Sequence, residues 1–186
     1  MEIIHTRLPG VFLLKPKLFG DDRGFFFESF QATRYAVQLG LSAPFVQDNL
    51  SRSEQGVLRG LHYQLQQPQD KLVTVIRGCV YDVVVDIRHG SPTFGQHFGT
   101  FLSDENHLQL FVPKGFAHGF CVVSPMVDFH YKCTDYYHPA SERGIHWADP
   151  NLKIDWPLTA PNLSVKDAAH PNLAEVSPDL LPPYRG

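Results

Sequence analysis

The segment 56–78 constrains the fold more than any other part of the chain. It begins with GVLRGLHYQ and ends with KLVTVIRG, two runs whose apolar and β-branched content is typical of strands. Residues 65–70 between them are polar and contain a proline, which is typical of a connecting loop. We therefore predict two adjacent strands that carry Arg59, His62 and Lys71.

Short strand-like runs continue along the rest of the chain, while helical patterns are scarce. Apolar runs separated by Gly, Pro, Asp and Asn predict further strands, two within 11–30 and others near 45–51, 80–88, 98–102, 108–112, 119–123 and 127–133. Short helices are expected at 33–39 and 164–167. We predict an all-β jelly-roll barrel with a few short peripheral helices. The 186 residues are expected to form a single domain, with an extended N-terminal strand region and a proline-rich tail from residue 149.

Charge and hydropathy exclude several classes of partner. The formal net charge of -3 leaves no basic field for nucleic acid, and no apolar run approaches the ~20 residues of a membrane span. The first seven residues are too short and too polar for a signal peptide. Cys79, Cys121 and Cys133 are an odd number without C-x-x-C spacing, which favours buried free thiols. We therefore expect a cytoplasmic protein with no nucleic-acid or membrane partner.

Two segments resemble the metal-binding motifs of cupin barrels. The first has a glycine, five residues and His62, and the second is the run PKGFAH at 113–118. Cupin metal sites use about three histidines and one carboxylate. Here Gln64 replaces the second histidine of the first motif, and Lys71 stands at about the place of the carboxylate. Because an ammonium group there would repel a divalent cation, we predict a cupin-type barrel without a metal or another cofactor.

Several polar residues have ordinary structural explanations when each is taken alone. His62 can be a hydrogen-bonded core histidine, Lys71 a solvated residue at a strand start, and Tyr131 core packing. Asp167 fits a Ser-x-x-Asp capping box, and His118 follows a tight turn that suggests the barrel rim. In combination, an imidazole, a phenol, an ammonium group and a carboxylate suit proton transfer at a carbon next to a carbonyl.

Longer motifs identify a family. They are GDDRGFFFES at 20–29, FVQDN at 45–49, GVLRGLH at 56–62, VDIR at 85–88, SPTFG at 91–95, PKGFAHGF at 113–120 and YKCTDYY at 131–137. With these segments in this order, the chain resembles the dTDP-4-dehydrorhamnose 3,5-epimerases from about residue 19 to residue 167. These are metal-free cupins of deoxysugar biosynthesis.

The resemblance implies roles for the matching residues. His62 is expected to be the base, paired with Asp167, while Tyr131 gives a proton to the opposite face and Lys71 stabilises the enolate at O4. A second carboxylate–imidazole pair is expected between Asp82 and His118. The positions that match contacts to the nucleotide or sugar are Arg23, Glu28, Gln47, Asn49, Arg59, His118, Glu142 and Lys166, together with Tyr137 as the aromatic that stacks on thymine. The resemblance also implies a homodimer, with Arg23 and Glu28 reaching the partner's site.

The expected activity is inversion of C3 and C5 of dTDP-4-dehydro-6-deoxy-D-glucose, which gives dTDP-4-dehydro-L-rhamnose for dTDP-L-rhamnose biosynthesis. A monoepimerase that acts at C3 or C5 alone, on an antibiotic deoxysugar pathway, is an alternative that the same residues would serve. A non-enzymatic sugar-binding or regulatory cupin is a second alternative, which the complete set of four catalytic side chains disfavours. A metal-dependent cupin oxygenase is a third, disfavoured by Gln64 and Lys71.

Overall fold

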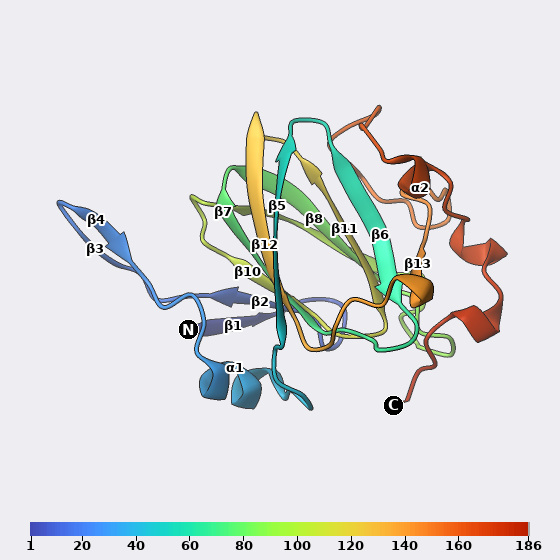
Figure 1. Ribbon diagram of the computed structural model, residues 1–186, viewed down its shortest axis with the longest axis horizontal. Coiled ribbons are helices and arrows are strands. Elements are labelled where there is room, and N and C mark those ends of the chain that lie inside the picture. The colour runs from blue at the N-terminus through green and yellow to red at the C-terminus, as the bar shows by residue number, and fades with distance from the viewer. Residues whose placement is uncertain (186) are drawn as a thin grey trace.

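The computed structural model describes residues 1–185 and places most of its strands in two antiparallel sheets (Figure 1). The first sheet has the order β1-β2-β10-β7-β12-β5 and the second β13-β6-β11-β8-β9. The strands of the first sheet are β1 (Glu2–His5), β2 (Phe12–Lys15), β10 (Gln109–Val112), β7 (Lys71–Arg77), β12 (Met126–Cys133) and β5 (Gln47–Glu54). Those of the second are β13 (Glu142–Gly144), β6 (Leu58–Gln64), β11 (Phe116–Val122), β8 (Cys79–Asp86) and β9 (His97–Ser103). Because neighbouring strands come from distant parts of the sequence, the fold is the predicted jelly-roll type.

The remaining elements lie outside the two sheets. A separate hairpin consists of β3 (Phe19–Asp21) and β4 (Gly24–Phe26). The helices are α1 (Ala32–Leu39), α2 (Val165–Ala168) and the 3-10 turns η1 (Pro139–Ser141), η2 (Leu173–Glu175) and η3 (Pro178–Leu180). The predicted helix at 33–39 is therefore confirmed, and Gly40 ends it in the left-handed conformation at φ 63°.

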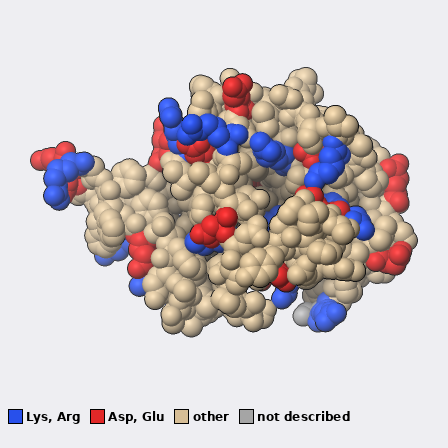
Figure 2. All heavy atoms as spheres, in the orientation of Figure 1, with Lys and Arg blue, Asp and Glu red and all other residues tan. Residues whose placement is uncertain are grey.

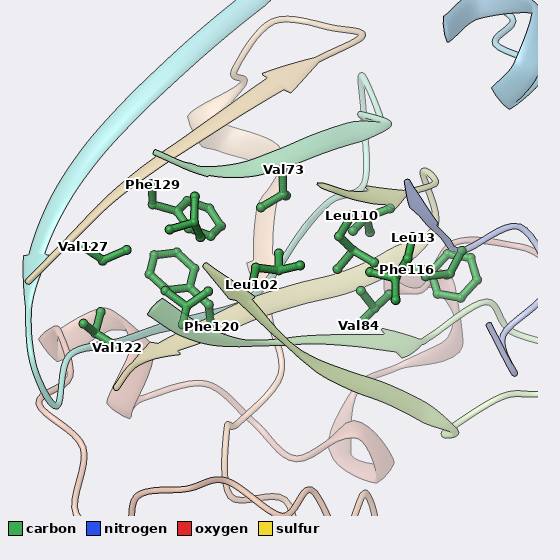
Figure 3. Packing of buried hydrophobic residues seen from close by; sticks show 14 of the residues in the cluster. Leu13, Val73, Val84, Leu102, Leu110, Phe116, Phe120, Val122, Val127 and Phe129 are labelled. Carbon is green, nitrogen blue, oxygen red and sulfur yellow. The ribbon is translucent and has the colours of Figure 1, made fainter. Parts of the chain in front are cut away.

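The main core fills the space between the two sheets. Val73 and Phe129 of the first sheet pack in one cluster with Val84 and Phe120 of the second (Figure 3). The rings of Phe120 and Phe129 are stacked with their centroids 3.9 Å apart, and both also line the cavity described below. This stacked pair therefore marks the place where the apolar core ends and the cavity begins.

The other face of the second sheet is also covered. Val83 and Val85 of β8 lie in a second apolar cluster with Ile145, Leu152 and Leu173. These last three residues come from the C-terminal third of the chain, which packs along the outside of the barrel (Figure 1). The proline-rich tail is therefore part of the folded structure, and it carries α2 to the edge of β6.

Two expectations about the strands were wrong. β6 and β7 were predicted to be adjacent, but they belong to different sheets because the loop 65–70 crosses from one sheet to the other. Two strands were expected within 11–30, but this range holds three, β2, β3 and β4, and the β3–β4 hairpin projects away from the body (Figure 1). The first difference places the side chains of β6 and β7 on opposite walls of the barrel.

Candidate active site

A cavity of about 460 Å³ opens between the two sheets. Lys and Arg side chains gather along the upper part of the face in Figure 2, around a hollow in its centre. The first sheet lines the cavity with Gln47, Asn49, Lys71, Tyr131 and Cys133, and the second with Arg59, His62, His118 and Phe120. Tyr137, Glu142 and Lys166 complete the wall. Of the residues predicted from the sequence, four do not line this cavity: Arg23, Glu28, Asp82 and Asp167.

Asp167 lies directly behind His62. Its Oδ1 is 2.5 Å from His62 Nε2, and its side chain is buried. The capping interpretation also holds, because the Asp167 backbone N–H donates to Ser164 Oγ at 3.0 Å. Burial alone would raise the pKa of Asp167, but contacts with His170 and His62 hold it below its ordinary value. Asp167 is therefore an ionised carboxylate, which can accept hydrogen bonds but cannot donate them. The proton between the two groups is consequently on His62 Nε2, and His62 Nδ1 keeps a lone pair.

His62 itself has the properties of a general base. Burial lowers the pKa of its imidazole below the ordinary value, although Asp167 opposes this shift, and the charge of Lys71 lowers it further. The ring is therefore neutral at pH 7 and free to accept a proton at Nδ1. Asp167 can then stabilise the imidazolium that forms.

Lys71 and Tyr131 face His62 from the first sheet. Burial lowers the pKa of Lys71, and no carboxylate among residues 1–185 lies within ion-pairing distance of its Nζ. Burial raises the pKa of Tyr131 to about 12, above the value near ~10 expected for a free phenol. The phenol is therefore protonated at pH 7. The cavity thus holds a neutral base on one wall, and an unpaired ammonium group and a protonated phenol on the other.

A second carboxylate–imidazole pair lies beside the first. His118 Nε2 is 2.8 Å from Oδ1 of the fully buried Asp82, and His118 pairs with His62 across β11 and β6. The alternative explanation that His118 sits at the barrel rim does not hold, because the preceding turn leads directly into the buried strand β11. The two strands approach closely at Gly60 and Gly119, since a Cβ added at Gly60 would lie 2.6 Å from the Gly119 Cα.

Charged and amide side chains surround the rest of the cavity. The Arg59 guanidinium donates to Ser53 Oγ at 3.1 Å and pairs with no carboxylate of the described chain. Glu142 accepts from Lys166 Nζ at 2.6 Å and from the Tyr137 hydroxyl at 2.8 Å. This arrangement leaves an excess of positive charge in the cavity, which suits an anionic ligand.

The amide side chain of Gln47 links Asn49, its neighbour in the cavity wall, to Tyr137. Gln47 donates to Asn49 Oδ1 at 3.0 Å and accepts from the Tyr137 backbone N–H at 2.9 Å. Tyr137 is therefore held beside the cavity although its side chain is half exposed. Its ring face is open to a planar group.

The structure does not bring Arg23 and Glu28 to this cavity. Arg23 lies in the β3–β4 hairpin and pairs with Asp21 at 2.5 Å, while Glu28 pairs with Arg34 at 2.5 Å. Gln64, which replaces a cupin ligand, also lies away from the cavity. Its side-chain amide donates hydrogen bonds to the backbone carbonyls of Gln67 and Tyr136, and so it links the two loops that contain these residues.

Sequence reasoning missed two residues of this region. Cys133 lines the cavity and follows Tyr131 by two positions, so the strand period of two could have identified it. Burial raises the pKa of its thiol to about 11, so it is inert at pH 7. His170 lies 3.6 Å from the Asp167 carboxylate, just beyond the end of α2 at Ala168. Within residues 1–185, one group of side chains can hold a metal ion, His62, Asp167 and His170, whose ligand atoms all lie within 4.8 Å of one another.

Comparison with known proteins decides the family. The family model described as dTDP-4-dehydrorhamnose 3,5-epimerase matches residues 5–175. The chain belongs to this family. It is 55% identical to the dTDP-4-dehydrorhamnose 3,5-epimerase of Pseudomonas aeruginosa over 168 residues, which cover 90% of this chain and 93% of the relative. It is 41% identical over 186 residues to the dTDP-4-dehydrorhamnose 3-epimerase of Streptomyces niveus, covering 99% of this chain and 90% of that protein.

The solved structures agree with this assignment. The crystal structure of dTDP-6-deoxy-D-glucose-3,5-epimerase from Legionella pneumophila Philadelphia 1, in complex with dTDP-4-keto-L-rhamnose, superimposes with a TM-score of 0.97 and 59% identity. The match covers 100% of this chain and 99% of that one. The predictions of the epimerase family and of an all-β, cupin-type fold are therefore confirmed. None of the helices in residues 1–185 has the length and apolar character that crossing a membrane requires.

Proposed function

We propose that the chain inverts C3 and C5 of dTDP-4-dehydro-6-deoxy-D-glucose, giving dTDP-4-dehydro-L-rhamnose by way of an enolate. The observation that carries this proposal is the placement of His62 on one sheet and of Tyr131 on the facing sheet. Inversion needs a proton to leave one face of the sugar and another to arrive on the opposite face. The epimerases at 55% and 59% identity support the same reaction.

The side chains divide the chemistry between them. His62 Nδ1 removes the proton from the carbon next to the C4 ketone, and Asp167 stabilises the imidazolium. The electron pair moves onto O4, where the unpaired ammonium group of Lys71 meets the negative charge. Tyr131 then gives its proton to the opposite face of the carbon. The same cycle acts at C3 and at C5, because both carbons adjoin the ketone.

The surrounding groups suit the rest of the substrate. The Arg59 guanidinium, which has no carboxylate partner, and the Lys166 ammonium can bind a diphosphate, and the open ring of Tyr137 can stack on thymine. Gln47, Asn49, His118 and Glu142 supply further polar contacts to the ligand. A dTDP-sugar substrate is supported by the Legionella relative, which was solved with dTDP-4-keto-L-rhamnose bound.

Incubation with the 4-keto sugar nucleotide in D₂O tests the reaction. We expect deuterium at both C3 and C5, read by NMR, together with inverted product. Label at one carbon only would show a monoepimerase, the reaction named for the Streptomyces niveus relative at 41% identity. Absence of label at both carbons would contradict enzymatic function and favour a sugar-binding cupin.

Lys71→Met is expected to lower kcat about 100-fold with little change in KM. The charge that Lys71 meets develops on O4 mainly in the transition state, so its loss should affect turnover more than binding. Steady-state kinetics on the 4-keto sugar nucleotide checks this. Lys132→Met is a matched control, because Lys132 lies on the neighbouring strand and pairs with Asp48 outside the cavity. A Lys71 variant that raises KM alone would reassign this residue to ground-state binding.

We further propose a homodimer in which the β3–β4 hairpin reaches the partner's cavity. In this hairpin the residues Phe19, Phe25 and Phe26 are 55%, 60% and 69% exposed to solvent. Their apolar side chains are therefore not covered by other parts of the chain. Arg23, at its turn, has a side chain that is 89% exposed. A variant without residues 19–26 should lose affinity for dTDP and run as a monomer in light scattering; a dimer with unchanged affinity would contradict this.

The three free thiols support a cytoplasmic location.

A further inference from the structure

His170 is held against the catalytic pair although the proposed reaction does not use it. Its Nε2 lies 3.6 Å from Asp167 Oδ1, close enough for an electrostatic contact, and is buried without a hydrogen-bond partner among residues 1–185. Its ring meets the His62 ring edge-on, with centroids 5.6 Å apart and planes at 82°. Gly144 makes room for it, because a Cβ at this position would overlap the His170 ring.

Two imidazoles and one carboxylate are a donor set that zinc prefers. Zn–N and Zn–O bonds of about 2.0–2.1 Å in tetrahedral geometry place the ligand atoms ~3.3 Å apart. The separation of 3.6 Å between His170 Nε2 and Asp167 Oδ1 is close to this value. The separation of 2.5 Å between His62 Nε2 and Asp167 Oδ1 has to widen by roughly 0.8 Å. Loss of the proton between these two atoms removes the hydrogen bond that holds them together.

We propose that His62, Asp167 and His170 form an inhibitory site for Zn²⁺. Zinc binds Nε2 of His62, Oδ1 of Asp167 and Nε2 of His170, and the single ring proton of the neutral His62 moves from Nε2 to Nδ1 by way of water. A water molecule is the fourth ligand, and it reaches the ion beside His62, whose side chain is the most exposed of the three at 25%. The site lies on the Asp167 side of the ring. It therefore differs from the cupin metal position, where Lys71 would repel the ion.

The consequence for activity rests on the proposed role of His62 as the base. With zinc on Nε2 and the ring proton on Nδ1, His62 has no lone pair with which to take a proton from the sugar, and zinc also takes the carboxylate that would stabilise the imidazolium. The groups proposed to bind the nucleotide, such as Arg59 and Tyr137, are not ligands of the metal. Zinc should therefore lower kcat and leave KM nearly unchanged.

Zinc titration of the EDTA-treated full chain tests the proposal. We expect calorimetry to detect one Zn²⁺ per chain at micromolar concentration, and kcat to fall as this site fills and to recover with EDTA. His170→Ala and His170→Gln should both weaken zinc binding and inhibition at least ~10-fold, each compared with its own zinc-free rate. Glutamine keeps most of the side-chain volume of His170, so a loss of zinc binding in this variant cannot be attributed to local collapse around an alanine. His5→Ala, which removes an exposed histidine of β1, should match the parent protein.

The possible failures are distinguishable. Zinc binding that is absent at about 100 µM, or that is equally tight in both His170 variants, would overturn the metal site. Zinc that binds through His170 but leaves kcat unchanged would confirm the site and contradict the role of His62 as the base. A rise in KM without a fall in kcat would overturn the proposed inhibition, because it would mean that zinc obstructs the substrate.

Discussion

His62→Asn is expected to abolish both deuterium exchange and inversion, with kcat reduced at least ~10³-fold. General acid–base groups contribute about 10²- to 10⁴-fold. The upper part of this range applies because His62 is assigned the first step, on which the whole cycle depends. His118 lies beside His62 in the cavity wall, and its Nε2 is likewise bound to a buried carboxylate, that of Asp82, so any residual exchange in the variant would point to His118. Without an imidazole at position 62, the enolate cannot form, so Lys71 and Tyr131 have no intermediate on which to act.

NMR of the substrate in D₂O measures this directly, because exchange reports the first proton transfer and inversion reports the complete cycle. Asparagine keeps a polar group at the position and limits structural change. His130→Asn is a suitable control, because His130 lies on β12 outside the cavity and its removal should leave both readouts intact. Exchange at the parent rate in His62→Asn would show that another group removes the proton.

Much of this site follows from the sequence because strands impose simple rules. Alternation places Gln47 and Asn49 on one face of their strand, and Tyr131 shares a face with Cys133. The glycine pattern around His62 also has a local physical cause, the close approach of Gly60 to Gly119. Such features depend on residues near one another in the sequence or directly paired, so they could be predicted.

The partition of strands between sheets could not be predicted in this way. The mostly polar loop 65–70 suits a hairpin and a crossover equally well, and only packing of the whole barrel decides between them. The same applies to His118, whose preceding turn is visible in the sequence while its burial against Phe129 and Asp82 depends on both sheets. His170 is a further example, since its position depends on space left by Gly144 on another strand. Contacts between distant segments therefore account for the errors in the sequence analysis.

Tyr131→Phe is expected to separate the two proton transfers. His62 should still form the enolate, exchange its proton with solvent and return it to the face from which it came. The variant should therefore incorporate deuterium with retained configuration, at a rate within ~10-fold of the parent protein, while inverted product falls about 10²- to 10³-fold. The Tyr131 hydroxyl, on the first sheet, is the group that gives a proton to the opposite face of the sugar. Phenylalanine removes this hydroxyl with little change in shape.

The raised pKa of Tyr131, about 12, is compatible with this role. A buried phenol stays protonated at pH 7, so it is ready to give a proton, and the carbanion that it meets is far more basic than the phenolate. Because the raised pKa keeps the phenol protonated at pH 7, almost no phenolate is present to act as a base, and this fixes the direction of transfer. Configuration and label can be read together by NMR, with Tyr136→Phe as a control because Tyr136 is 62% exposed and does not line the cavity. Exchange that is lost in Tyr131→Phe but persists in His62→Asn would reverse the assignment, since Tyr131 would then be the base and His62 a group that orients the substrate.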